Sequence, residues 1–328
     1  MTSRSSAALQ AVVAGILFST GGAAVKATEL DGWQVAGTRS LIAAVVLLVA
    51  IPAARRWAGG PDGTSRVAAI GWWRSPARRS ALLLTVGTGC CYCLTLVLFV
   101  HAAKRTTAAE TIFLQSTAPL FVLLLSPILL RERLGWRRLL FVPLFGAGLV
   151  MAFFGGAEAV ASAPDPRTGN VLAVFCGLAY GLTLMGLRAA GRSPAARPVR
   201  AAGAASSLGD GEDVRATGIA AAACGNVIVC LACLPVMATL TAAAPGDFLV
   251  VAYLGLFQVA LAYVFVARAA SVLQAPVVAL LLLLEPALTP VWAMWFHGEQ
   301  PHLLTWLGGA VIAVATVLLA AVVRSPKE

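Results

Sequence analysis

Long uncharged apolar runs alternate with short polar segments along the whole chain, and the polar segments carry almost all of the charge. A helix needs about 20 predominantly apolar residues to cross a bilayer, and the runs have about this length. The pattern therefore predicts an all-α membrane protein with ten transmembrane helices. We expect these helices at residues 7–25, 33–51, 80–100, 106–130, 139–154, 169–187, 216–241, 248–267, 272–296 and 303–323.

Two stretches of the chain share one pattern at an offset of 167 residues. Each is an apolar run with a proline, followed 13 residues later by a glutamate: Pro119 and Glu132 in the first, Pro286 and Glu299 in the second. Duplicated halves in a membrane chain are typical of transporters more than of enzymes. The prolines are also candidate hinges, because each removes a backbone hydrogen bond from its helix.

The duplication divides the chain into two repeats of five helices each. We place the first repeat at 7–154, an extracytoplasmic connecting loop at 155–168, and the second repeat at 169–323. Within the second repeat, residues 188–215 are rich in Arg, Ala, Gly and Ser, and we interpret them as a flexible cytoplasmic linker. Because each repeat has an odd number of spans, the two repeats are inverted relative to each other, which places a binding site between them near mid-membrane.

Composition and charge support this interpretation. Hydrophobic residues make up 59% of the chain and charged residues 12%, whereas a soluble domain carries about 25% charged residues. The net charge of +10 comes mainly from one side of the predicted membrane, where 19 Lys and Arg residues fall, against 4 on the other side. The positive-inside rule then places both termini in the cytoplasm. We expect the chain to be a multi-pass protein of a bacterial-type cytoplasmic (inner) membrane. We expect no nucleic-acid partner, because no soluble domain presents a basic face.

The seven cysteines all fall inside apolar runs, and two pairs have C-x-x-C spacing: Cys90 with Cys93, and Cys230 with Cys233. No His or acidic residue accompanies either pair, so we interpret these cysteines as small buried hydrophobic residues rather than as a redox or metal site. We expect no metal and no cofactor.

Several short motifs match a known family of membrane proteins. In the first half they are His101-Ala-Ala-Lys104, the turn at Thr106-Thr-Ala108, Pro119 and Leu130-Arg-Glu-Arg-Leu134; in the second they are Leu284-Glu-Pro286, Gly298-Glu299, Gly308 and Ala315. On these residues the chain resembles EamA-type permeases of the drug/metabolite transporter superfamily over residues 7–323. The resemblance implies ten helices, with the third, fourth, eighth and ninth around a central cavity. It also implies a secondary transporter of amino acids, sugars, nucleobases, drugs or other metabolites, usually directed outward in bacteria. The chain departs from the family at Ala275-Pro276, where Thr/Ser-Ala is expected, and in the length of its linker.

Glu285 is the sharpest candidate for a functional residue. It lies near the middle of the ninth run, and a carboxylate at that depth costs several kcal/mol unless it is paired, protonated or facing water. Pro286 frees a backbone carbonyl near the same position. We expect Glu285 to bind substrate or couple transport to protons, although a structural carboxylate that stabilises a broken helix by hydrogen bonds fits the same pattern.

Arg39 is a cation within the second predicted span, and Glu110 lies near the outer start of the fourth. Arg39 is a candidate ligand for an acidic group of the substrate or for Glu110. The alternative, which the sequence favours, is that both side chains reach the lipid headgroups by snorkelling.

Further polar and aromatic side chains lie within spans, where a bilayer offers them no water, so we expect them to face the bundle interior. Each alone fits an inter-helix hydrogen bond; together they predict a polar, aromatic-lined cavity. They are Gln115, Gln258, Tyr263, Asn226, Tyr180 and Trp292. Glu132 and Glu299 mark helix ends, where we expect ion pairing or solvation rather than metal binding.

Enzyme motifs such as H-E-x-x-H, G-x-S-x-G and the P-loop do not occur in the sequence, so any transport is expected to be secondary and without ATP. We expect a small-molecule substrate, membrane lipid and protons as partners, and a homodimer remains open. Two other classes also remain open: a lipid-modifying membrane enzyme, which needs a carboxylate pair or metal cluster at headgroup level, and a non-transporting receptor or regulator.

Overall fold

The first repeat is helical throughout its described spans. The computed structural model describes residues 4–57, 76–131, 136–155, 159–191, 209–240, 244–270, 272–273 and 275–324. The helices of the first repeat are α1 (Arg4–Ser19), α2 (Gly21–Lys26), α3 (Gly32–Trp57), α4 (Pro76–Ala103), α5 (Ala108–Gln115), α6 (Ala118–Leu129), α7 (Trp136–Leu139) and α8 (Phe141–Gly155).

The second repeat has the same plan with one irregular span. Its helices are α9 (Pro166–Gly191), α10 (Gly209–Met237), α11 (Pro245–Tyr253), the π-helix η6 (Leu254–Leu261), α12 (Ala262–Ala270), α13 (Ala275–Leu282), α14 (Leu284–His297) and α15 (Leu303–Arg324). Ten helical segments among the described residues are long and apolar enough to cross a membrane. The prediction of an all-α membrane protein with ten spans is therefore confirmed.

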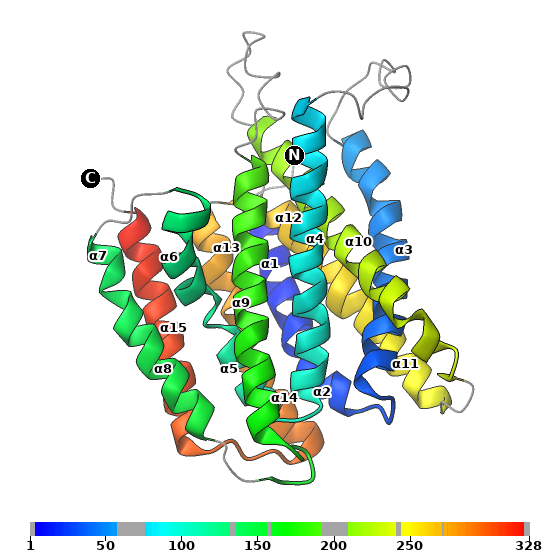
Figure 1. Ribbon diagram of the computed structural model, residues 1–328, viewed down its shortest axis with the longest axis vertical. Coiled ribbons are helices and arrows are strands. Elements are labelled where there is room, and N and C mark those ends of the chain that lie inside the picture. Colours follow the sequence, from blue (N-terminus) through cyan, green and yellow to red (C-terminus); the bar gives the residue numbers. More distant parts are fainter. Residues whose placement is uncertain are drawn as a thin grey trace.

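The packing partners of the helices reveal a two-fold relation between the repeats. Second spans pack together (α3 on α10), and so do fifth spans (α8 on α15). The first span of each repeat packs on the third span of the other, as α9 on α4 and α1 on α12. Figure 1 shows α8 and α15 side by side at one edge, while α1 and α9 run through the middle. This exchange of partners is the arrangement expected of two inverted repeats.

The two spans that carry Pro119 and Pro286 are broken, and each break contacts a glycine of the opposite repeat. Pro119 lies in the first turn of α6, just after the α5–α6 break, and Pro286 follows the α13–α14 break at Leu283. A Cβ on Gly177 would lie 3.0 Å from the Leu114 carbonyl oxygen, and one on Gly15 would lie 3.2 Å from that of Leu281. Leu114 and Leu281 are 167 residues apart, so the offset read from the sequence also relates the two breaks in space.

The helices extend further into the expected linker than the hydropathy suggested. Residues 188–191 belong to α9 and residues 209–215 to α10, both of which we expected to be part of the flexible segment 188–215. The remainder of that linker lies outside the described residues. A helix whose apolar part is packed can continue past the hydrocarbon, because its backbone hydrogen bonds are internal.

The two ends of the bundle are referred to below by their place in Figure 1. The upper side carries the start of α1 and the end of α15; the lower side carries the end of α2, the α4–α5 turn and the α14–α15 connection. By the charge distribution along the sequence, the upper side is the predicted cytoplasmic side.

Candidate functional site

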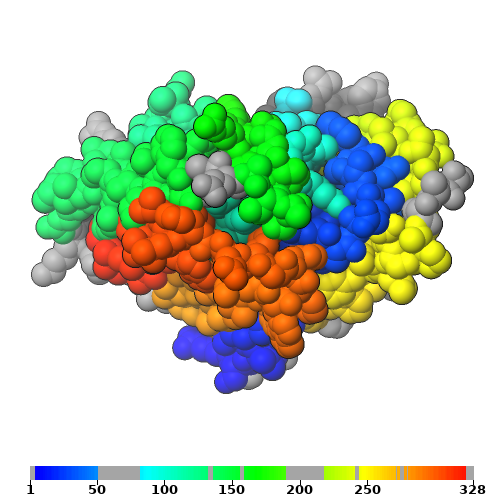
Figure 2. Space-filling model, turned by 90° about the horizontal axis from the view of Figure 1, so that it is seen from below, coloured from blue at the N-terminus to red at the C-terminus, as the bar shows by residue number. Residues whose placement is uncertain are grey.

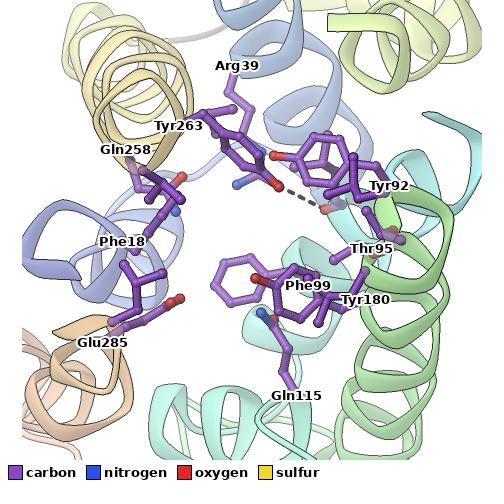
Figure 3. A pocket seen from close by; sticks show the side chains of 17 residues that line it. Phe18, Arg39, Tyr92, Thr95, Phe99, Gln115, Tyr180, Gln258, Tyr263 and Glu285 are labelled. Atoms are coloured by element: carbon purple, nitrogen blue, oxygen red, sulfur yellow. Dashed lines mark hydrogen bonds between the residues drawn. The ribbon is translucent and has the colours of Figure 1, made fainter. Parts of the chain in front are cut away.

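A cavity of about 160 Å³ lies between the two repeats. Both repeats contribute to its wall, which includes side chains from the third, fourth, eighth and ninth spans. Figure 3 shows the polar and aromatic side chains of α3, α4, α9, α12 and α14 pointing toward one another around it. The lining residues are Phe18, Arg39, Tyr92, Thr95, Leu96, Phe99, Gln115, Tyr180, Thr183, Leu184, Leu187, Gln258, Val259, Tyr263, Val266, Leu282 and Glu285.

Aromatic side chains form one wall of the cavity. The rings of Tyr92 and Tyr263 meet edge to face across the repeat boundary, with centroids 5.1 Å apart. Phe18 packs edge to face on the other side of Tyr263 at 5.8 Å. Such ring pairs hold one another in a defined orientation, so this wall is fixed by both repeats together.

Arg39 is buried, with 1% of its surface exposed. Its Nη2 donates to the Leu96 carbonyl at 2.9 Å, and its guanidinium lies 5.9 Å from the centroid of the Phe99 ring. Its Nε has no hydrogen-bond partner in the described part of the chain. The expectation that Arg39 snorkels to the headgroups is therefore wrong, because the side chain turns inward across the α3–α4 contact.

Glu110 also differs from the expectation, because it neither snorkels nor pairs with Arg39. It is fully buried and caps its own helix: Thr106 and the Thr107 backbone N–H donate to its carboxylate, and its backbone N–H donates to the Thr107 hydroxyl at 3.1 Å. This capping box satisfies the first backbone donors of α5. Glu110 therefore stabilises the α4–α5 turn and the start of α5.

Glu285 follows the α13–α14 break and borders the cavity as a half-buried side chain. The Thr289 hydroxyl donates to its backbone carbonyl at 2.8 Å. Within the described residues, no hydrogen bond or salt bridge holds its carboxylate. The carboxylate therefore stands at the cavity wall rather than tying the break together.

Gln115 and Gln258 complete the polar lining. The Gln115 side-chain oxygen accepts a hydrogen bond from the Cys176 thiol at 3.3 Å. Gln258 lies on the π-helix η6, and its side-chain oxygen is buried without a partner among the described residues. Single-turn π segments recur at functional sites because the extra residue changes the direction in which side chains project. Here the segment places both Gln258 and Tyr263 on the cavity wall.

The close approach of η6 to α3 explains the glycine at 255. A Cβ on Gly255 would lie 2.6 Å from the Arg39 carbonyl oxygen, and 2.7 Å from the Ile42 Cβ. We expect Gly255→Ala to lower the free energy of unfolding by about 1–3 kcal/mol, the usual cost of overpacking. Thermal unfolding in detergent checks this. Gly246→Ala, in α11 of the same span and with open space at its Cβ, should have little effect; equal losses in both variants would contradict the explanation.

The structure brings five predicted site residues together at the cavity and places two elsewhere. Arg39, Gln115, Gln258, Tyr263 and Glu285 line it, as does Tyr180. Trp292 instead donates to the Ser19 hydroxyl at 2.9 Å and lines a separate groove with Tyr253 and Phe296. Asn226 lies buried in α10, where it donates to the Ala222 carbonyl at 2.8 Å. The position of these two residues away from the cavity corrects the sequence-based prediction that they belong to the same site.

Three polar lining residues were not predicted: Tyr92, Thr95 and Thr183. Tyr92 satisfies the criterion that selected the others, a polar group within a span, and it falls between Cys91 and Cys93 in an uncharged run. The two threonines give no comparable signal, because a span threonine can bond to the carbonyl four residues earlier. Thr95 and Thr183 both do so, to Cys91 and Ala179.

On the lower side, a buried ion pair joins the two repeats. Lys26 Nζ lies 2.8 Å from Glu299 Oε1, with both side chains nearly inaccessible. Lys26 also donates to the backbone carbonyls of Thr106 and Ser162, and Glu299 Oε2 accepts from the Ala108 N–H at 2.9 Å. Glu299 is thus an ion-paired helix-end residue, as expected, whereas Glu132 lies outside the described residues.

A second hollow of about 670 Å³ lies at this lower end, lined by Lys26, Lys104, His297 and Glu299 among others. It shares no lining residue with the central cavity. Figure 2 shows this face, where the orange segment of α14 and α15 lies directly against green and blue segments of the first and second repeats. The two hollows are therefore distinct, and the Lys26–Glu299 pair lines the lower one.

The remaining chemistry-bearing residues form no further site in the described part of the chain. No three His, Cys, Asp or Glu residues there are grouped as metal ligands. The seven cysteines are free thiols, and of the two C-x-x-C pairs, Cys230 and Cys233 are buried while Cys90 is exposed. The expectation of buried cysteines is wrong for Cys90, which faces outward from the bundle.

Comparison with known proteins adds the following. The family model described as the EamA-like transporter family matches residues 5–154 and 213–321. One protein of known crystal structure is 19% identical and superposes with a TM-score of 0.56, over 98% of this chain and 100% of the other; at that identity the likeness concerns the fold alone. The search among curated proteins found no match.

Proposed function

Because the chain belongs to the EamA-like transporter family, we propose that it is a secondary active transporter that exports small metabolites, such as amino acids or drugs, across the cytoplasmic membrane. The observation that carries this proposal is the cavity between the repeats, which is lined by both and bordered by the carboxylate of Glu285. A mid-membrane site between inverted repeats is what alternating access requires, because rocking one repeat against the other exposes the site to each side in turn.

The distance over which the cavity extends along the helices supports assigning the structure to one state of the alternating-access cycle. Its lining extends upward along α9 as far as Leu187, four residues before that helix ends. Downward it ends near Phe99 and Gln115, and the Lys26–Glu299 ion pair lies beyond. With the upper side cytoplasmic, this arrangement corresponds to an inward-facing form that is closed toward the outside.

Glu285 is suited to coupling substrate movement to protons. A carboxyl group between two helices and a cavity can exchange a proton with whichever side the cavity faces. Its carboxylate is not committed to a structural hydrogen bond within the described residues, so a change in its protonation leaves the α13–α14 break intact. Protonation would alter the charge of the cavity wall and hence its affinity for substrate.

We expect Glu285→Gln to reduce gradient-driven transport at least about 10-fold, as loss of a proton-transferring group does elsewhere. The measurement is uptake and release of a labelled amino-acid panel in proteoliposomes, with and without a pH gradient. Thermal unfolding should be unchanged, because the amide occupies the same volume.

The matched control is Glu29→Gln, which removes an exposed carboxylate outside the spans and should transport normally. Normal transport by Glu285→Gln across the pH range would make Glu285 a structural residue. If the unaltered protein transports no amino acid, the next substrates to test are sugars, nucleobases and hydrophobic cations.

A further inference from the structure

Arg39 places a positive charge at the centre of the protein without an acidic partner. A guanidinium stays protonated in proteins, and this one is 1% exposed. Lys26, another buried cation, lies 2.8 Å from Glu299. Within the described residues no carboxylate forms a salt bridge with Arg39, although Glu285 lines the same cavity.

The contacts that Arg39 does make satisfy only part of its charge. One of its five N–H donors bonds to the Leu96 carbonyl, and the Phe99 ring lies within cation–π range. The buried Nε has no partner among the described residues, and Figure 3 shows the side chain reaching from α3 toward Tyr263 and the cavity. A buried charge without a counter-charge is costly, and an anionic group entering the cavity would remove that cost.

Hydrogen-bond donors and acceptors other than Arg39 occupy different parts of the cavity wall. The Gln115 oxygen is occupied by the Cys176 thiol, which leaves its NH₂ group facing the cavity as a second donor (Figure 3). The acceptors, Glu285 and the unpartnered oxygen of Gln258, lie together on another wall. Arg39 and Gln115 lie at opposite ends of the cavity, so an anion bonded to Arg39 lies away from Glu285 (Figure 3).

We propose that Arg39 binds a carboxylate of the transported molecule, so that the cavity selects small carboxylate-bearing molecules over amines of the same size. A planar carboxylate matches the parallel N–H donors of a guanidinium. The cavity of about 160 Å³ resembles in size an engineered protein cavity of about 150 Å³ that holds benzene. This inference rests on the proposed transport function for its biological meaning, but binding can be tested without transport.

The test is thermal unfolding of the purified protein in detergent with rising butyrate, 2-aminobutyrate or butylamine, each against potassium chloride of equal ionic strength. A ligand that binds only the folded protein raises its stability in a saturable way. We expect both carboxylates to stabilise the protein and butylamine not to do so. If 2-aminobutyrate is the stronger ligand, the acceptor wall contributes a contact to its ammonium group.

Arg39→Gln should weaken carboxylate binding about 10- to 100-fold, which is the loss of one charge-assisted hydrogen-bonded contact. Arg39→Lys keeps the charge but lacks the paired N–H donors, so its carboxylate affinity should lie between those of the unaltered protein and Arg39→Gln. The control Arg167→Gln removes an exposed cation on the lower side and should bind like the unaltered protein. Stabilisation that is absent, equal with butylamine, or unchanged in Arg39→Gln overturns the proposal.

If neither Arg39 variant folds, chemical modification of the unaltered protein still tests the proposal. Phenylglyoxal modifies arginine side chains, and peptide mass spectrometry follows each one. Butyrate should slow modification of Arg39 and leave that of Arg167 unchanged; equal rates at Arg39 with and without butyrate contradict the proposal. Carboxylate binding without any transport would overturn the proposed function alone, whereas Glu285-dependent transport without carboxylate binding would overturn this inference alone.

Discussion

Lys26→Met is expected to lower the free energy of unfolding by about 3–5 kcal/mol, because it leaves the buried Glu299 carboxylate without its counter-charge. Glu299 is 3% exposed, so water does not replace the lost ammonium group. The substitution also removes the donors to the Thr106 and Ser162 carbonyls. Chemical or thermal unfolding of the purified protein in detergent measures the loss.

Two variants separate the charge effect from the loss of a side chain. Adding Glu299→Gln to Lys26→Met removes the unpaired charge, so the double variant should recover most of the lost stability. Arg167→Met removes an exposed cation from the same side of the protein and should change stability by no more than about 0.5 kcal/mol. The assignment of a buried pair would be wrong if Lys26→Met and Arg167→Met behaved alike.

Removing the Lys26–Glu299 ion pair should also affect the proposed transport cycle. In the proposed alternating-access cycle, a pair that joins the two repeats on the lower side would have to separate when the cavity opens in that direction. A variant that weakens a contact made in only one state shifts the population toward the other. We expect the Lys26→Met/Glu299→Gln protein to favour the form that is open on the lower side.

Gly148→Leu is expected to give the second large loss, at the contact between α8 and α15. A Cβ at Gly148 would lie 2.8 Å from Ile312 Cγ1 and 3.0 Å from the Gly308 carbonyl oxygen. Small residues let helices approach closely in lipid, and forcing the two backbones apart costs about 1–3 kcal/mol or more. A lower unfolding temperature and a lower yield of folded protein in detergent are the readouts.

Gly146→Leu is the matched control, because it makes the same change two residues earlier on the same helix. Its Cβ would meet no atom within 4 Å, so the leucine side chain would project into lipid. Leucine is also the better helix former by about 0.8 kcal/mol, so stability should be unchanged or slightly higher. Equal losses from the two substitutions would contradict the packing of α8 on α15.

The sequence by itself determined the number of membrane spans and their division into two repeats. The number of spans follows from the length of its apolar runs, since a bilayer of fixed thickness accepts only helices of a matching length. The offset of 167 related the two breaks, since Leu114 and Leu281 just before them are 167 residues apart, because duplicated sequence folds into duplicated structure. Pro119 and Pro286 likewise marked the two broken spans, since proline lacks the N–H that continues a helix.

Only the tertiary structure decided which way each side chain faces. A helix that is apolar all round has no amphipathic stripe to show its buried side, so sequence could not separate Gly148 from Gly146. For the same reason Trp292 and Asn226 were grouped with Gln258, although they contact other neighbours.

The charges depended on tertiary structure in the same way. Arg39 turns inward to the Leu96 carbonyl, and Lys26 meets Glu299 from the opposite repeat, 273 residues along the chain. Local hydropathy places a charge at a depth in the membrane, but the free energy of that charge depends on the neighbours that surround it. For Arg39 those neighbours lie on α4 of the same repeat, and for Lys26 they lie on the other repeat, so in both cases only the packing of the helices brings them together.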